Sequence, residues 1–414
     1  MLCYAENIHF WDGQTKRSVK MVKFKLKKQF YVVALLIIVI SQIAAFTNKF
    51  GTTYIGWAVN VVRLFVLFPI VKFVSGCNSK VYVSYVFTML LGFLFHLQLA
   101  SITLYNDFWE VLGWLMIIYI LFVSKLYHSR IIQIAAICFF SVNCGIAFFE
   151  KITETRFIEY DSEILEGFVL TGDRSTQEFR AFGLLGHPLT NACVTSIFLG
   201  FILVNESLPK TLKFLLLGTG LLGLVAFNSR GGILIWVLVL FYRFALYNKG
   251  FVKTAIPLTI LLFAYPFIMD WIDSGALGRF SFDFSDGSSA TRWESFLFFA
   301  MQDWDLETIL LGGRYIKMPG TDLLLENGVL LNLSYWGWLV GTLKTILEMI
   351  ISYVVINKYD RRDKFIVVFA FWGAALTNNI ITGLLPLTFF VFAYEAFYVS
   401  DTVPLQIKQH ESII

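Results

Sequence analysis

Two stretches of this sequence place an arginine beside glycines and directly ahead of an apolar run. In Phe179–Asn191 the arginine is Arg180, and the same stretch contains His187; in the stretch 228–232 it is Arg230. Glycine allows close backbone approach and leaves N–H groups accessible at a helix start, and a guanidinium group binds two oxygens at once. We therefore predict that both stretches contribute to a site for an anionic oxygen, such as that of a phosphate.

A candidate general base lies ahead of a later apolar run, in Glu326-Asn327-Gly328, with Asp322 close by. A partly desolvated carboxylate has a raised affinity for protons, so Glu326 could take a proton from a sugar hydroxyl. A carboxylate or amide at a helix start can equally serve as a cap, and local sequence does not separate the two roles. A lone histidine such as His187 is more commonly a hydrogen-bonding residue than a base.

The amino-acid composition is that of a polytopic membrane protein, so membrane-spanning elements must position these residues. Of 414 residues, 57% are hydrophobic, 17% are aromatic and only 15% are charged, which is far more apolar than a soluble domain. Apolar runs long enough to cross a bilayer recur along the chain, and they favour helices because lipid cannot satisfy free backbone groups. The net charge of +4 is too small to indicate nucleic-acid binding. The five cysteines have no metal-ligand spacing, so no metal site is expected.

The fold class that follows is all-α, with about twelve transmembrane helices in one domain over 29–400. Lysines and arginines gather on alternate connections, so the positive-inside rule places the basic N-terminus 1–28 and the tail 401–414 in the cytoplasm. The predicted spans are 29–46, 55–74, 81–101, 108–124, 131–149, 190–205, 211–228, 231–248, 251–271, 328–356, 364–384 and 386–400.

This topology leaves two long connections on the outer face, 150–189 and 272–327, and long ordered loops are more often functional than idle. Thr291 and Glu294 have capping-box spacing and predict a short helix that lies in the outer interface. Asp303-Trp304-Asp305 resembles the short acidic motif that holds a metal-bound nucleotide sugar, but the role of a solvated helix end is favoured for it. Arg63 falls inside a predicted span, where it pairs internally or binds substrate.

In its outer-loop motifs the chain resembles the O-antigen ligase and O-antigen polymerase superfamily of bacterial envelope proteins. The resemblance covers 150–345 and rests on three blocks, which are Arg180-Ala181-Phe182-Gly183 through Gly186-His187-Pro188 to Asn191-Ala192, then Asn228-Ser229-Arg230-Gly231-Gly232, and then Thr291-Arg292-Trp293, Gly312-Gly313, Glu326-Asn327 and Gly337. In the ligase branch a histidine typically precedes the asparagine of the third block, whereas this chain has Glu326. That departure favours a polymerase of surface or exopolysaccharide.

The resemblance implies a membrane glycosyltransferase of the bacterial inner membrane. Such an enzyme transfers an undecaprenyl-diphosphate-linked glycan to the hydroxyl of an acceptor glycan at the outer face, without metal or cofactor, and it works beside a flippase and a chain-length regulator. Arg180 and Arg230 would neutralise the departing diphosphate, and Glu326 would act as the base and give inversion. The implied substrate-binding residues are His187, Arg292, Arg314, Asn327 and Asp322.

Two alternatives remain open at the level of sequence. A ligase of the same architecture would differ only in its acceptor. A polysaccharide transporter or flippase would instead require internal repeats with paired charged or broken helices near the bilayer midplane, and the sequence shows no convincing repeat.

Overall fold

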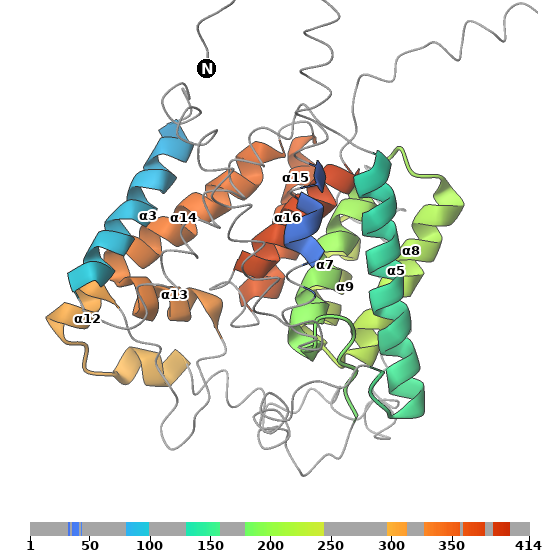
Figure 1. Ribbon diagram of the computed structural model, residues 1–414, viewed down its shortest axis with the longest axis horizontal. Helices are drawn as coiled ribbons and strands as arrows, with labels where there is room; N and C mark the ends of the chain where they lie inside the picture. The colour runs from blue at the N-terminus through green and yellow to red at the C-terminus, as the bar shows by residue number, and fades with distance from the viewer. Residues whose placement is uncertain are drawn as a thin grey trace, which may run out of the picture.

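The computed structural model describes residues 32–33, 35–40, 43, 80–98, 130–157, 179–243, 296–312, 327–356, 359–376 and 384–397, and the regular secondary structure of these residues is entirely helical. Figure 1 shows the helices as a bundle with α12 and α13 at its lower end. Their bounds are α3 Lys80–Gln98, α5 Arg130–Thr153, α7 Pro188–Val204, α8 Lys210–Ala226, α9 Arg230–Phe241, α12 Leu306–Leu311, α13 Gly328–Trp336, α14 Trp338–Val355, α15 Arg361–Leu376 and α16 Leu384–Phe397.

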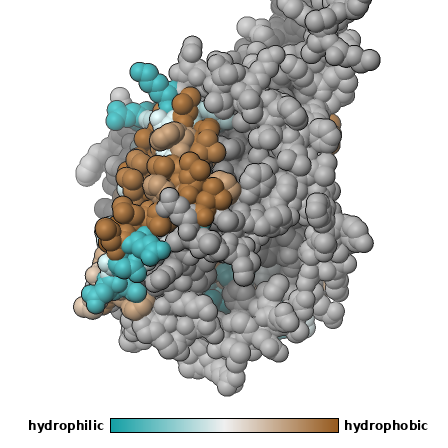
Figure 2. Space-filling view, turned by 60° about the vertical axis from the view of Figure 1, so that its left-hand side comes forward, coloured by the Kyte–Doolittle hydropathy of each residue, from teal (hydrophilic) through white to brown (hydrophobic). Residues whose placement is uncertain are grey.

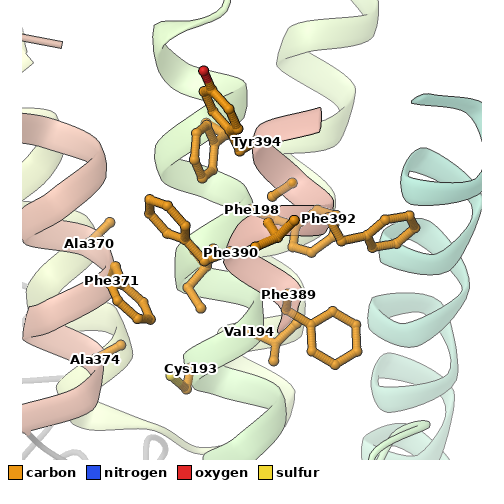
Figure 3. Packing of buried hydrophobic residues seen from close by; sticks show 14 of the residues in the cluster. Cys193, Val194, Phe198, Ala370, Phe371, Ala374, Phe389, Phe390, Phe392 and Tyr394 are labelled. Atoms are coloured by element: carbon orange, nitrogen blue, oxygen red, sulfur yellow. The ribbon is translucent and has the colours of Figure 1, made fainter. Parts of the chain in front are cut away.

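Helix α7 forms the centre of the bundle. Every residue of α7 except Leu189 is buried, as expected for a helix that is apolar on all sides. Phe198 of α7 stacks on Phe140 of α5 at 5.4 Å between ring centroids, and Figure 3 shows it among aromatic side chains of α16. Gly200 brings α7 against α15, because a Cβ at that position would lie 2.9 Å from the Cβ of Ala370. Helix α7, which follows the loop of Arg180, therefore anchors that loop to the core.

The two ends of the bundle are distinguished by their contacts. At one end, here called the basic end, Lys213 near the start of α8 donates to the carbonyl of Asn205 after α7, and Arg243 after α9 pairs with Asp363 of α15 at 3.0 Å. At the opposite end, here called the site end, the N–H of Ala181 donates to the carbonyl of Ala226 at the end of α8. Helices α5 and α15 both begin with arginine at the basic end (Figure 1).

The outward faces of the described helices are apolar. Phe87 of α3 and Phe214 of α8 are 66% and 71% exposed, and they are two of many large apolar side chains on the surface. Figure 2 shows a band of such side chains on the face of α3 and α14, between hydrophilic ends. Two described helices, Lys80–Leu97 and Arg130–Thr153, are long and apolar enough to cross a membrane. Extensive exposed apolar surface of this kind indicates contact with a membrane or a partner, so membrane association is indicated.

The structure corrects the sequence prediction near the C-terminal third. The single span predicted at 328–356 is two helices, α13 and α14, because Gly337 adopts a φ of +78° that ends one helix and redirects the next. Residues 296–301 are helical within the segment predicted as an interfacial helix, and α12, which was not predicted, follows it. Asp305 accepts from the N–H of Thr308 as the α12 cap, which is the predicted helix-end role of that acidic cluster. The spans predicted at 55–74, 108–124 and 251–271 lie outside the described residues.

Candidate functional site

One buried carboxylate shapes the loop that contains Arg180. The side chain of Glu150, near the end of α5, is fully buried. Its Oε2 accepts from the N–H groups of Phe182 at 2.7 Å and Gly183 at 2.9 Å, and its Oε1 accepts from the N–H of Phe157 at 2.9 Å. Three backbone hydrogen bonds to one side chain tie the segments around Phe157 and Phe182 together.

Two buried asparagines complete the frame of the loop. Asn143 of α5 accepts from the N–H of Leu184 at 2.8 Å, and Asn191 of α7 donates through Nδ2 to the carbonyls of Phe182 and His187. Gly183 has a φ of +55°, and a Cβ there would lie 2.9 Å from Oδ1 of Asn143, so the turn requires glycine for both conformation and space. The backbone N–H groups of Phe182, Gly183 and Leu184 therefore bond internally, which differs from the anion contacts predicted for this loop.

Cationic side chains surround the same loop. Arg180 lies in it and is partly buried. The guanidinium carbon of Arg156 lies 4.3 Å from the centroid of the Phe182 ring, a cation–π distance. Lys151 donates from Nζ to the carbonyl of Phe179 at 2.9 Å. Because Glu150 holds the backbone on both sides, Arg156 and Arg180 are supported by one rigid frame.

His187 is the N-cap of α7. Its Nδ1 accepts from the N–H groups of Leu189 at 3.1 Å and Thr190 at 3.2 Å, and Pro188 occupies the first helical position, where its missing N–H costs nothing. Burial and, secondarily, the charge of Arg180 lower the pKa of His187 to about 4. The ring is thus neutral near pH 7 with its proton on Nε2, which suits hydrogen-bond donation to an oxygen rather than proton abstraction through Nδ1.

This cap predicts a pH dependence of stability. Because the pKa of His187 falls from an ordinary value near 6.5 to about 4 on folding, the unfolded chain binds more protons between these values, and stability should decrease as the pH falls through that range. His187→Asn keeps a capping side chain without titration, so its melting temperature should depend less on pH between about 6.5 and 4 than that of the wild type. Equal pH profiles of the two proteins in differential scanning fluorimetry would contradict this assignment.

The second arginine stretch forms a tight turn between α8 and α9 at the site end. Asn228 adopts a φ of +50°, which asparagine tolerates better than most residues, and Ser229 caps α9 by accepting from the N–H of Gly232 at 3.2 Å. Arg230 is the first residue of α9. The link from Ala181 to Ala226 places the Arg180 loop beside the end of α8, so the first two arginine stretches come together as predicted from the sequence.

The described part of the third sequence block, at the end of α12 and along α13, also lies at the site end (Figure 1). Asn327 caps α13, since its Oδ1 accepts from the N–H groups of Val329 at 3.0 Å and Leu330 at 3.2 Å. Gly312 and Gly337, far apart in sequence, pack backbone against backbone: a Cβ on Gly312 would lie 2.2 Å from the nitrogen of Gly337. Of the two roles considered for this region, the structure shows capping for Asn327, and its predicted substrate contact remains a prediction.

Several predicted site residues lie outside the described residues, namely Glu326, Asp322, Arg292 and Arg314, as does Arg63. The backbone of Arg230 is described, whereas its side chain is not. The residues that sequence reasoning missed are Glu150 as the frame of the loop and Arg156 as a second arginine upon it. A usable signal existed for Glu150, because a carboxylate at the end of an apolar run is costly unless it has partners.

Comparison of the chain with protein-family models, with curated proteins and with solved structures finds no match.

Proposed function

We propose that this chain is a membrane polysaccharide polymerase, which transfers an undecaprenyl-diphosphate-linked glycan to the hydroxyl of an acceptor glycan. The observation that supports this most directly is the loop of Arg180, which Glu150 and Asn143 hold rigidly at one end of an apolar helical bundle. A preorganised cation at the mouth of an apolar bundle suits a substrate with a lipid tail and an anionic diphosphate. In this proposal the site end faces the outside of the bacterial inner membrane.

The complete topology in this proposal has about twelve spans with both termini in the cytoplasm. The lysines and arginines of the basic end favour a cytoplasmic position for that end, and the arginines of the site end are assigned to the substrate in this proposal. The outer placement also fits the energy source of the reaction, since the lipid diphosphate is itself a good leaving group and requires neither nucleotide nor metal. A flippase would deliver the substrate to this face, and a chain-length regulator would act on the product.

The proposed reaction forms one bond and breaks one. The acceptor hydroxyl oxygen attacks the anomeric carbon of the lipid-linked glycan, the bond from that carbon to the diphosphate oxygen breaks, and the hydroxyl proton passes to Glu326. The diphosphate leaves with an additional negative charge, which Arg180 and Arg230 stabilise. Attack opposite the leaving group inverts the anomeric configuration. His187 would orient a sugar or phosphate oxygen through its Nε2–H.

The proposal is tested by reconstitution of the purified protein in liposomes with lipid-linked repeat units present on both leaflets. A polymerase should convert single repeat units into longer lipid-linked chains, as seen by gel electrophoresis. Transfer of a preformed polymer to a different acceptor, without chain elongation, would identify a ligase. Movement of the substrate between leaflets without any transfer would identify a transporter. Either of the last two results overturns the polymerase proposal.

A further inference from the structure

An ion pair is buried within the apolar bundle away from the arginine loop. Lys344 and Glu348 are one helical turn apart in α14, with Nζ 2.8 Å from Oε1, and both side chains are almost completely buried. Burying a charge in such surroundings is expensive, so a buried ion pair is weak evidence for stability and its contacts with other helices deserve examination.

The pair connects three helices. Tyr85 of α3 donates to Oε1 of Glu348 at 2.9 Å, and Lys344 donates to Oδ1 of Asn332 in α13 at 3.3 Å. Asn332 in turn donates from Nδ2 to Oγ1 of Thr345 at 3.3 Å. We refer to Tyr85, Asn332, Lys344 and Glu348 together as the polar lock. Tyr85 and Asn332 are also fully buried, so the polar lock lies in the interior of the bundle.

Helix α13 is held at its C-terminal end by α3, where Nε2 of His96 lies 2.8 Å from the carbonyl oxygen of Tyr335 and the His96 ring stacks on Trp336, and the polar lock holds it nearer its middle. It has nine residues, about 14 Å, which is too short to cross a bilayer, and it meets α14 at the turn of Gly337. Glycine has a wide choice of backbone angles, so this turn by itself allows α13 to pivot. Near the pivot, Gly341 lets the two helices touch, since a Cβ there would lie 2.5 Å from the carbonyl oxygen of Asn332. The bonds of Asn332 to Lys344 and Thr345 then join the middle of α13 to α14.

We propose that the polar lock fixes the angle between α13 and α14 and thereby holds the start of α13, at Asn327, where the transfer reaction requires it. The inference rests on the proposed function, because Asn327 directly follows Glu326, the candidate base. Asn332, Lys344, Glu348 and Tyr85 are positioning residues, since they act through α13. Displacement of a reacting group by about 1 Å can reduce a rate about 100-fold, so a small change in the angle has a large effect.

The test uses two variants of the full-length protein. Asn332→Leu cuts the bonds between the polar lock and α13 and leaves Lys344 paired with Glu348. The triple variant Tyr85→Phe/Lys344→Met/Glu348→Leu removes the whole connection without leaving an unpaired buried charge, which a single substitution of Lys344 would do. Ser352→Ala is the matched control, because Ser352 is a buried polar residue of α14 that bonds to Trp372 of α15 and not to α13.

We expect both variants to lower kcat by about 10- to 100-fold with KM for the lipid-linked donor within about twofold of the wild type. Amide hydrogen exchange of residues 329–336 should accelerate while that of α7 stays unchanged, and Ser352→Ala should alter neither quantity. Unchanged kcat per folded enzyme in both variants would overturn the positioning role. If the wild type has no transferase activity, the proposed function fails, and unchanged exchange in α13 would then separately overturn the polar lock.

Discussion

Replacement of Glu150 by alanine should reduce glycan transfer by at least about 100-fold, although Glu150 belongs to the frame of the site and contacts no substrate in the proposed mechanism. The carboxylate is the acceptor for three backbone N–H groups, those of Phe157, Phe182 and Gly183. Each buried donor that loses its partner costs about 1–3 kcal/mol, so the native loop conformation becomes unfavourable relative to open ones. Arg180 and Arg156 then lose their fixed positions.

Two further variants separate the loss of the acceptor oxygens of Glu150 from the loss of a negative charge. Glu150→Gln keeps one acceptor oxygen but points an N–H₂ group at backbone donors, so its activity should lie between those of the wild type and Glu150→Ala. Glu154→Gln is the matched control, since Glu154 is an exposed glutamate in the same turn and its loss should leave activity within about twofold of the wild type. Activity, melting temperature and amide exchange of residues 181–186 should be measured together. Wild-type activity in well-folded Glu150→Ala would show that the loop does not depend on this carboxylate.

Glu150 also illustrates what the sequence could and could not predict. The apolar runs predicted most of the described helices, since helix formation in such runs depends on local composition. The function of Glu150 depends on hydrogen bonds to residues about thirty positions further along the chain, and no local pattern indicates such partners. The i,i+4 spacing of Lys344 and Glu348 was visible in the sequence, whereas their burial between α3 and α13 was not.

The break at Gly337 has a similar explanation. The run 328–356 is mostly apolar. An isolated glycine inside such a run is usually tolerated within one helix. What ends α13 is tertiary: Gly337 packs against the backbone at Leu310 and Gly312, and a Cβ there would lie 2.6 Å from the carbonyl oxygen of Leu310. The position of His187 at a helix start was predictable, because a proline at the next residue marks the first helical position in the sequence.

The direct test of the proposed chemistry is removal of its charged groups. Arg180→Ala and Arg230→Ala should each lower kcat by about 100- to 1000-fold, because a preorganised donor to a developing negative charge contributes that much to a rate. Glu326→Gln should reduce kcat to a similar extent, since an amide cannot accept the hydroxyl proton. Product length on gels and initial rates with purified lipid-linked donor are the measurements. Arg130→Ala is the control arginine, because Arg130 is exposed at the basic end of α5.

The conservative variant Arg180→Lys distinguishes charge from geometry. A lysine keeps the positive charge but offers a single ammonium group in place of the planar fork that binds two oxygens of one phosphate. If Arg180 binds the departing diphosphate in this way, Arg180→Lys should remain at least about tenfold slower than the wild type, and most of the loss should appear in kcat. Full activity in Arg180→Lys would reduce the role of Arg180 to a general positive potential. Full activity in Arg180→Ala, Arg230→Ala and Glu326→Gln alike would place the reaction elsewhere in the molecule.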